Sequence, residues 1–299
     1  MKNKKITSIG EILFDVYPKE NKLGGAPFNF IFHVNKITGS GNFISRIGED
    51  NLGSNIRSFF LANNITDKYL QIDKEHKTGI ANANLDEQKI PHWKIEEDTA
   101  YDFISPETEA KELIEKDTDC LYFGTLAQRS ETSRSTIQSL FGNNIKYFCD
   151  LNVRQNYYSK EIIEKSLKAA NVLKLNYDEL KLINDLLIKK EFDIVSLAKE
   201  ISSKYKVDLI CVTMGEDGAV LVRDEQVDKY KVSVNNIIDT VGAGDAYAAV
   251  LCLGYLNDWD ISKINKLACF FAAETTLING ALPKNDSVYE KIRNEFNDG

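Results

Sequence analysis

Residues 239–251 read Asp-Thr-Val-Gly-Ala-Gly-Asp-Ala-Tyr-Ala-Ala-Val-Leu, a loop of small residues that runs directly into an apolar segment. The pattern predicts a helix over 246–256 that begins beside Gly242, Ala243 and Gly244. Small residues let a backbone approach a ligand closely, and the first N–H groups of a helix have no partner within it. The stretch therefore predicts an anion site at a helix N-terminus, suited to a phosphate group.

Asp245 ends this loop, at the start of the predicted helix. The positive end of the helix dipole stabilises a carboxylate there, which favours an ionised side chain at neutral pH. An ionised carboxylate beside an anion site can act as the base for a hydroxyl group that attacks a phosphate. The alternative is purely structural, because aspartate and glycine often cap a helix.

Other well-known phosphate-binding patterns are absent from the sequence. A P-loop needs a Gly-Lys pair, and the chain contains none. A dinucleotide-binding fingerprint needs a third small residue after Gly242 and Gly244, but Tyr247 stands there, far from the first predicted strand. The protein-kinase signatures are missing as well. The stretch over 239–251 therefore matches none of these three known patterns.

On both sides of this stretch, short β-rich runs alternate with segments of helical periodicity. Strands are predicted over 6–14, 43–47, 120–123, 146–150, 172–175, 209–213, 219–223 and 229–232. Helices are predicted over 54–63, 132–141, 160–170, 178–188, 194–205, 246–256, 261–276 and 288–296. This alternation predicts an α/β fold, with a mostly parallel sheet and helices on both of its faces. No linker or internal repeat interrupts it, so 1–299 is predicted to form a single main domain.

Residues 72–105 depart from the alternation. They contain two short polar strands, 79–85 and 90–95, with no convincing helix between them. We expect a hairpin-like insertion that forms, with about 11–23, a small β lid over the carboxyl edge of the sheet. The alternative is an edge hairpin that only extends the sheet. A lid with an apolar face can also pair with a second chain, so a homodimer through the lid is expected.

The amino-acid composition limits which partners the protein can bind and in which compartment it is expected. The 299 residues include 37 Lys and Arg against 45 Asp and Glu, a net charge of −8, which argues against nucleic acid as a partner. There is no run of about 18 apolar residues, and Gly10, Glu11 and Asp15 interrupt the apolar N-terminal stretch, so neither a membrane span nor a secretion signal is predicted. Five widely spaced cysteines without a Cys-x-x-Cys pair predict reduced core residues in a cytoplasmic protein.

Seven further motifs occur along the chain. They are Gly10-Glu-Ile-Leu-Phe-Asp15, Gly24-Gly-Ala-Pro-Phe-Asn29, Ile47-Gly-Glu-Asp-Asn-Leu-Gly53, Asp150-Leu-Asn-Val-Arg154, Asn176-Tyr-Asp-Glu179, Thr213-Met-Gly-Glu-Asp-Gly-Ala219 and Gly280-Ala-Leu-Pro283. Together with 239–245, and in this order over essentially the full chain, they resemble the motifs of the ribokinase-like (PfkB-type) carbohydrate kinases, most closely those of bacterial fructokinases. The resemblance implies the ribokinase-like fold with its small β lid.

The resemblance also implies a sugar site and a catalytic base. An aspartate at a strand end and a Gly-Gly loop with its asparagine would bind sugar hydroxyls, and an arginine would clamp a sugar oxygen or the moving phosphoryl group. In this sequence the sugar-site residues are Asp15, Gly24, Gly25, Asn29 and Arg154. The base would be Asp245, with the N–H groups of Gly242, Ala243 and Gly244 as the anion hole. The structural alternatives are a solvated strand end for Asp15 and a surface arginine for Arg154.

Two cofactors are implied in the same way. ATP would be bound by Asn176, Thr213, Gly215, Gly218, Gly242, Gly244, Gly280 and Ala281. Mg²⁺ would be oriented by Glu179 through water, since Mg²⁺ usually keeps several waters; Asn176 and Glu179 are also compatible with a helix start that Asn176 caps. A monovalent cation such as K⁺, near Asp239 and Val241, is implied by the family alone.

These expectations combine into an ATP-dependent sugar kinase, with fructose as the first choice of substrate. The run Phe-Gly-Thr-Leu-Ala-Gln-Arg over 123–129 and the Gly-Gly-Ala-Pro loop favour a fructokinase. A 2-keto-3-deoxygluconate kinase would share much of this pattern, and a ribokinase or nucleoside kinase would share its core. A non-catalytic sugar or nucleotide sensor on the same fold is a different class, against which the intact Asp245 and anion loop argue.

Overall fold

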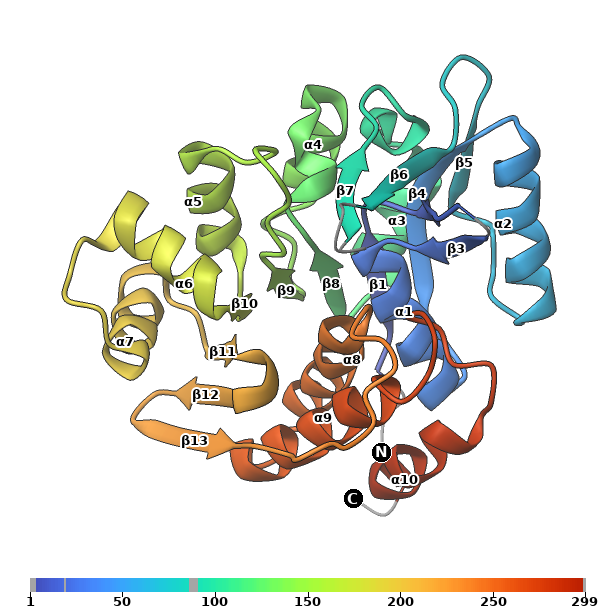
Figure 1. The fold of residues 1–299 in the computed structure, drawn as a ribbon. Coiled ribbons are helices and arrows are strands. Elements are labelled where there is room, and N and C mark those ends of the chain that lie inside the picture. Colours follow the sequence, from blue (N-terminus) through green and yellow to red (C-terminus); the bar gives the residue numbers. More distant parts are fainter. Residues whose placement is uncertain (1–3, 19, 86–90, 298–299) are drawn as a thin grey trace.

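The computed structural model describes residues 4–18, 20–85 and 91–297. Its centre is a nine-stranded sheet with the strand order β13-β12-β11-β10-β9-β8-β1-β4-β5 (Figure 1). Its strands are β1 (Ile6–Ile9), β4 (Asn42–Gly48), β5 (Leu70–Asp73), β8 (Cys120–Phe123), β9 (Lys146–Asp150), β10 (Val172–Asn176), β11 (Leu209–Thr213), β12 (Ala219–Arg223) and β13 (Gln226–Tyr230). Neighbouring strands from β5 to β11 are parallel, whereas β12 and β13 are antiparallel to their neighbours.

Helices cover both faces of this large sheet, as the alternation predicts. One face packs against α1 (Ala26–Thr38), α2 (Asn51–Ala62), α8 (Ala243–Leu256), α9 (Ile261–Thr275) and α10 (Ser287–Asn297). The other packs against α3 (Thr108–Lys116), α4 (Glu131–Ser139), α5 (Lys160–Ala169), α6 (Tyr177–Ile183) and α7 (Ile194–Tyr205). Short turns lie at η1 (Ala100–Phe103), η2 (Leu126–Arg129), η3 (Asn184–Ile188) and η4 (Gly215–Asp217). The predicted α/β class is confirmed.

The strand predicted over 6–14 is wrong as a single element. The structure divides it into β1, in the large sheet, and β2 (Leu13–Val16), which belongs to a second sheet. The chain crosses between the sheets at Gly10, Glu11 and Ile12. Gly25 packs closely against this crossing, with φ +111°, and a Cβ on it would lie 2.6 Å from the Glu11 carbonyl oxygen. The second glycine of the Gly-Gly loop is therefore required where two backbone segments meet.

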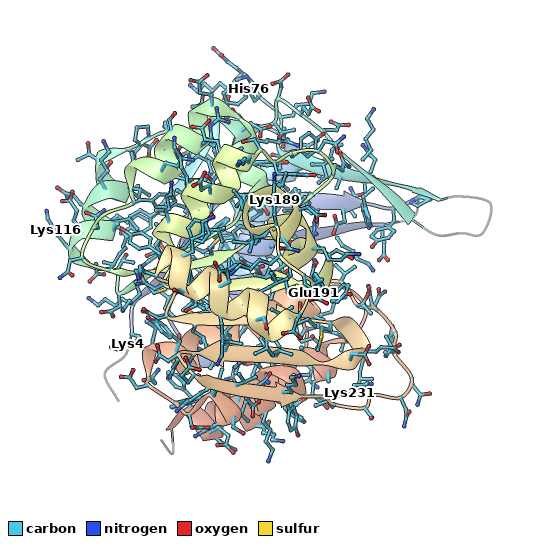
Figure 2. The ribbon with its side chains drawn as sticks, turned by 90° about the vertical axis from the view of Figure 1, so that its left-hand side faces the viewer. Lys4, His76, Lys116, Lys189, Glu191 and Lys231 are labelled. Carbon is cyan, nitrogen blue, oxygen red and sulfur yellow. The ribbon has the colours of Figure 1, made fainter. Side chains whose placement is uncertain are left out.

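The second, small sheet has the strand order β3-β2-β6-β7. It adds β3 (Asn21–Gly24), β6 (Gly79–Leu85) and β7 (Pro91–Ile95) to β2, and Figure 2 shows it projecting from the side of the molecule. The span 72–105 proposed for the lid is too wide, because β5 lies in the large sheet and η1 packs in its core. Position 90, the first residue of a predicted strand, lies outside the described residues.

The cysteines are core residues of the fold. All five are free and buried, as predicted, among the apolar side chains on both faces of the large sheet. None of the helices in the described ranges is long and apolar enough to cross a membrane.

Candidate active site

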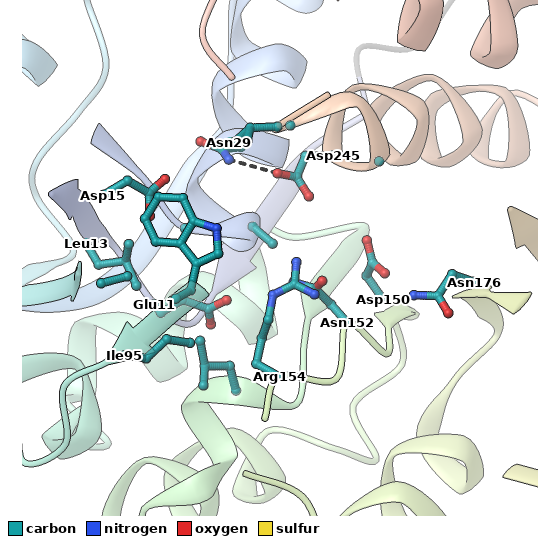
Figure 3. Close-up of a pocket in the computed structure, with 18 of the residues that line it drawn as sticks. Glu11, Leu13, Asp15, Asn29, Ile95, Asp150, Asn152, Arg154, Asn176 and Asp245 are labelled. Carbon is teal, nitrogen blue, oxygen red and sulfur yellow. Dashed lines mark hydrogen bonds between the residues drawn. The ribbon is translucent and has the colours of Figure 1, made fainter. Parts of the chain in front are cut away.

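A cavity of about 510 Å³ lies between the large and the small sheet, at the carboxyl ends of the parallel strands. Most of the predicted site residues line it, although they come from distant parts of the chain (Figure 3). They are Asp15, Gly25, Asn29, Arg154, Asn176, Glu179, Thr213, Gly242, Gly244 and Asp245. The small sheet supplies part of the wall through Leu13, Asp15, Ala81, Trp93 and Ile95.

A second cavity, of about 710 Å³, adjoins the first. The predicted residues Gly215, Gly218 and Ala243 line it, with a largely apolar set of side chains that includes Val232, Val234, Ile237, Tyr247, Ala272 and Ala273. Both cavities share Thr213, Thr240 and Gly244. The predicted anion loop therefore lies at the junction of a polar cavity and a more apolar one.

The anion loop has the geometry of a helix N-terminus that is open to a ligand. Gly242 is the N-cap of α8, with φ +81°, and Ala281 packs directly beneath it. Within residues 4–18, 20–85 and 91–297, the N–H groups of Gly242 and Gly244 donate no hydrogen bond, while that of Ala243 reaches the Thr240 carbonyl oxygen at 3.3 Å. Two N–H donors without a partner therefore lie at the N-terminus of α8, beside the first cavity.

Asp245, in the first turn of α8, accepts a hydrogen bond of 2.8 Å from the side-chain amide of Asn29. Burial raises the pKa of Asp245 to about 6, and the negative charge of Asp150 adds to the effect. Desolvation of this carboxylate therefore outweighs the stabilisation that the helix N-terminus offers. A pKa of about 6 still leaves Asp245 mostly ionised at neutral pH, which a general base requires.

This pKa predicts how activity depends on pH. A base works only in its deprotonated form, so kcat/KM is expected to be level above pH 7 and to fall as the pH drops through about 6. Initial rates between pH 8 and pH 5 measure this, with circular dichroism at each pH to confirm that the fold persists. A rate that stays constant down to pH 5 would contradict a base with this pKa.

Asn176 and Glu179 form the structural motif that was the alternative to a metal site. The Asn176 side chain caps α6 by accepting from the Glu179 N–H at 2.9 Å, and Glu179 accepts from the Asn176 N–H at 2.8 Å. The second Glu179 oxygen accepts from the Val153 N–H. Both side chains line the first cavity. Their role toward Mg²⁺ stays a prediction, and the cap explains how Glu179 is held there.

The predicted cation residue Asp239 is already engaged by its own chain. Its carboxylate accepts from the N–H groups of Val241 (3.1 Å) and Gly280 (2.9 Å), and the Lys22 ammonium lies 3.5 Å away. Lys22 belongs to β3, so this contact links the small sheet to the loop before α8. Because an ammonium already faces Asp239, the present arrangement does not suit a K⁺ ion at this carboxylate.

Gly24, Gly280 and Ala281 support the site rather than line either cavity. A Cβ on Gly24 would lie 3.2 Å from an Asp15 carboxylate oxygen, so this glycine leaves room for that carboxylate. Gly280 donates its N–H to the Asp239 carboxylate, and Ala281 packs against Gly242.

The Asp15 carboxyl lines the first cavity. Burial raises the pKa of Asp15 to about 6.

Lys174 and Asp150 are site residues that sequence reasoning missed. Lys174, on β10, is 7% exposed and donates to both Asp150 carboxylate oxygens at 3.0 and 2.8 Å. Burial by itself would lower the pKa of Lys174, but Asp150 raises it and the net shift is upward, so Lys174 stays protonated. A Cβ on Gly244 would lie 3.4 Å from the Lys174 ammonium. A positive charge therefore lies next to the free N–H groups of the anion loop.

Comparison with known proteins agrees with this geometry. Residues 3–286 match the model of the pfkB family carbohydrate kinases. Fructokinase of Escherichia coli is 26% identical over 84% of each chain. The structure of a sugar kinase of Pyrococcus horikoshii in complex with ATP has a TM-score of 0.81, at 25% identity over 97% of this chain and 99% of that one. A Vibrio cholerae fructokinase double mutant, solved with fructose, ADP and a potassium ion, shares the fold at a TM-score of 0.80 and 21% identity, over 96% and 97% of the two chains. The chain belongs to the pfkB family of carbohydrate kinases and is a sugar kinase.

Proposed function

We propose that this kinase transfers the γ-phosphoryl group of ATP to a hydroxyl of a neutral sugar, most specifically fructose. The observation that carries the proposal is the place of Asp245. Its carboxylate lines the first cavity, fixed by Asn29, beside the anion loop that both cavities share. A hydroxyl in the first cavity and a phosphate reaching in from the second would meet at this point.

The second cavity suits the nucleotide. Its apolar lining offers contact to a flat base, and its volume lies within the range of about 300–1,000 Å³ typical of small-molecule sites. Gly215 has φ +58° and nothing within 4 Å of the Cβ it lacks, so a phosphate can approach its backbone. ATP would extend from this cavity past Thr213 to the free N–H groups of Gly242 and Gly244.

Transfer would depend mainly on positioning and charge. Asp245 would accept the proton of the attacking hydroxyl, while Asn29 holds the carboxylate in place. The N–H groups of Gly242 and Gly244, with the Lys174 ammonium behind them, would stabilise negative charge on the phosphoryl oxygens. Mg²⁺, when bound with ATP, supplies charge neutralisation. The described residues contain no group of three metal-binding side chains, which suits an ion held largely by phosphates and water beside Asn176 and Glu179.

Charge in the first cavity favours a neutral sugar over a sugar acid. Its titratable lining consists of the carboxyls of Glu11, Asp15, Asp150, Glu179 and Asp245 against the cations Arg154 and Lys174. Lys174 is already paired with Asp150, so Arg154 is the cation left among the described residues of this lining. A 2-keto-3-deoxy acid would add a further negative charge here, whereas a ketose adds only hydroxyl groups.

The small sheet is well placed to act as the lid over this sugar. Trp93 and Ile95 of β7 face the cavity, and the 152–158 loop reaches the same strand, since Gln155 donates to the Trp93 carbonyl oxygen at 2.7 Å. This position favours a lid over an edge hairpin that only extends the large sheet. Dimerisation through the small sheet stays a prediction.

A substrate panel tests the proposed function. We expect kcat/KM for fructose to exceed the values for ribose, adenosine and 2-keto-3-deoxygluconate by at least about tenfold. A site whose polar groups bind the hydroxyls of one sugar leaves some of these groups without a partner when another substrate binds, and this disfavours the other substrate. A tenfold preference for the keto acid would make fructose wrong and leave the kinase in place. Binding of sugar and ATP without any turnover would support a sensor.

A further inference from the structure

Glu11 lies where the chain crosses from the large to the small sheet, between β1 and β2. Its side chain is 2% exposed, yet it lines the first cavity, and Figure 3 shows its carboxyl pointing into that cavity toward the Arg154 guanidinium. Its Oε2 atom is buried and has no hydrogen-bond partner within the described parts of the chain. A buried carboxyl oxygen without a partner destabilises a fold, so its retention needs another reason.

The neighbouring charged groups do not satisfy this carboxyl. Arg129 is nearby, but its Nε and Nη2 atoms donate to the two Asp102 carboxylate oxygens at 2.8 and 2.7 Å. The Arg154 guanidinium bonds within its own loop, to the Val153 carbonyl oxygen at 3.3 Å. Burial raises the pKa of Glu11 to about 7. Glu11 thus lines the first cavity with one carboxyl oxygen unpaired among the described residues.

We propose that Glu11 is a substrate-binding residue, whose carboxyl hydrogen-bonds a hydroxyl of the sugar and whose charge excludes acidic substrates. This inference rests on the proposed function and deepens it. Asp15, on β2, faces the same cavity after the crossing, so carboxyls before and after the crossing would contact different hydroxyls of one sugar. In its ionised form, which predominates above about pH 7, the Glu11 carboxylate accepts hydroxyl hydrogen bonds that are stronger than those between neutral groups, and its charge repels the carboxylate of a sugar acid.

The rival explanation is a structural network. Arg129 Nη1 and the Tyr101 hydroxyl are also buried without partners, and a trapped water could join them to Glu11. Neither Arg129 nor Tyr101 lines the cavity, however, whereas Glu11 does. The two explanations differ in what removal of the carboxyl does to stability. Loss of a network member lowers the melting temperature, whereas loss of an unpaired carboxyl leaves it unchanged or raises it.

The experiment compares Glu11→Met and Glu11→Gln with Glu115→Gln, a matched change at an exposed position of α3. Melting temperature and kcat/KM are measured for a panel of fructose, ribose and 2-keto-3-deoxygluconate. For the neutral sugar that the wild type uses best, Glu11→Met is expected to lower kcat/KM by at least about tenfold, at an undiminished melting temperature. Glu11→Gln keeps hydrogen bonding but not charge, so its kcat/KM for that sugar should fall less than in Glu11→Met. The ratio of kcat/KM for 2-keto-3-deoxygluconate to kcat/KM for that sugar should rise at least about threefold.

Three results would overturn the role of Glu11. One is unchanged kinetics in Glu11→Met, and another is lost activity together with a clearly lowered melting temperature, which would assign Glu11 to the network. The third is a wild type that prefers the sugar acid. A wild type that prefers ribose to fructose would instead contradict the fructose proposal alone, and the Glu11 variants would then be read with ribose.

Discussion

Asp245→Asn is expected to lower kcat by at least about 10²-fold, the low end for loss of a general base. The amide has nearly the shape of the carboxylate and can keep a hydrogen bond to Asn29, which now reaches Asp245 at 2.8 Å. What it cannot do is accept the proton of the sugar hydroxyl. Steady-state rates at saturating ATP and sugar measure the loss, and isothermal titration with an ATP analogue should show nucleotide binding retained.

The same variant should not lose stability. Burial raises the pKa of Asp245 above its ordinary value, so ionising this carboxyl is less favourable in the folded protein than in the unfolded chain. At neutral pH the carboxylate is ionised in both states, and its burial therefore lowers the free energy of unfolding. Removing the charge is therefore expected to leave the melting temperature unchanged or to raise it. The control is Asp224→Asn, in the exposed turn between β12 and β13, which should change neither property. Turnover near the wild-type level in a folded Asp245→Asn protein would remove Asp245 from its role as the base.

The large sheet was predictable because its strands are short apolar runs between amphipathic helices. The ranges predicted for β8, β9, β11 and β12 coincide with those of the structure. The prediction fails at 6–14, where apolar residues on both sides of Gly10 and Glu11 belong to two different sheets. Sequence periodicity records which side chains are buried but not against which sheet they lie, so the crossing at Glu11 could not be read from it.

Helices α1 and α3 were not predicted at all. In α1, Phe28, Phe30 and Phe32 alternate with other residues in the manner of a strand, yet all three are buried in a helix. A helix that is apolar all round has no polar face, so the helical period that reveals a surface helix is missing. The shorter α3 is mostly polar and has few apolar positions from which a period can be read.

The candidate site also contains residues that could be predicted from the sequence and residues that could not. Residues in compact motifs, such as Asp245 with its glycines, were predictable because small residues, a helix start and a carboxylate are adjacent in sequence. Lys174 and Glu11 were not, because Lys174 is a lone polar residue inside an apolar strand and Glu11 lies in the short connection between β1 and β2. Only the fold brings Lys174 beside Asp150 and the anion loop, and only the crossing between sheets aims Glu11 at the cavity.

Gly242→Ala is expected to lower kcat by at least about 10²-fold, the cost of losing an anion-hole donor. A Cβ at this position would lie 2.4 Å from the Ala281 Cβ and 2.6 Å from its Cα, so the loop must move away from the 280–281 segment beneath it. The move would displace the free N–H groups of Gly242 and Gly244 from the phosphate. The φ of +81° adds strain of about 1 kcal/mol or more for any residue with a Cβ.

A matched control separates this clash from the strain. Gly142 also has a positive φ, +93°, but nothing lies within 4 Å of the Cβ it lacks, and it lines neither cavity. Gly142→Ala should therefore lose only the stability that the backbone strain costs and keep its kcat, since it shares the strain but not the clash. Melting temperatures and kcat for both variants, measured with the same sugar, provide the comparison. If the two variants lose kcat equally, or Gly242→Ala keeps it, the anion loop does not hold the phosphoryl group in the way we propose.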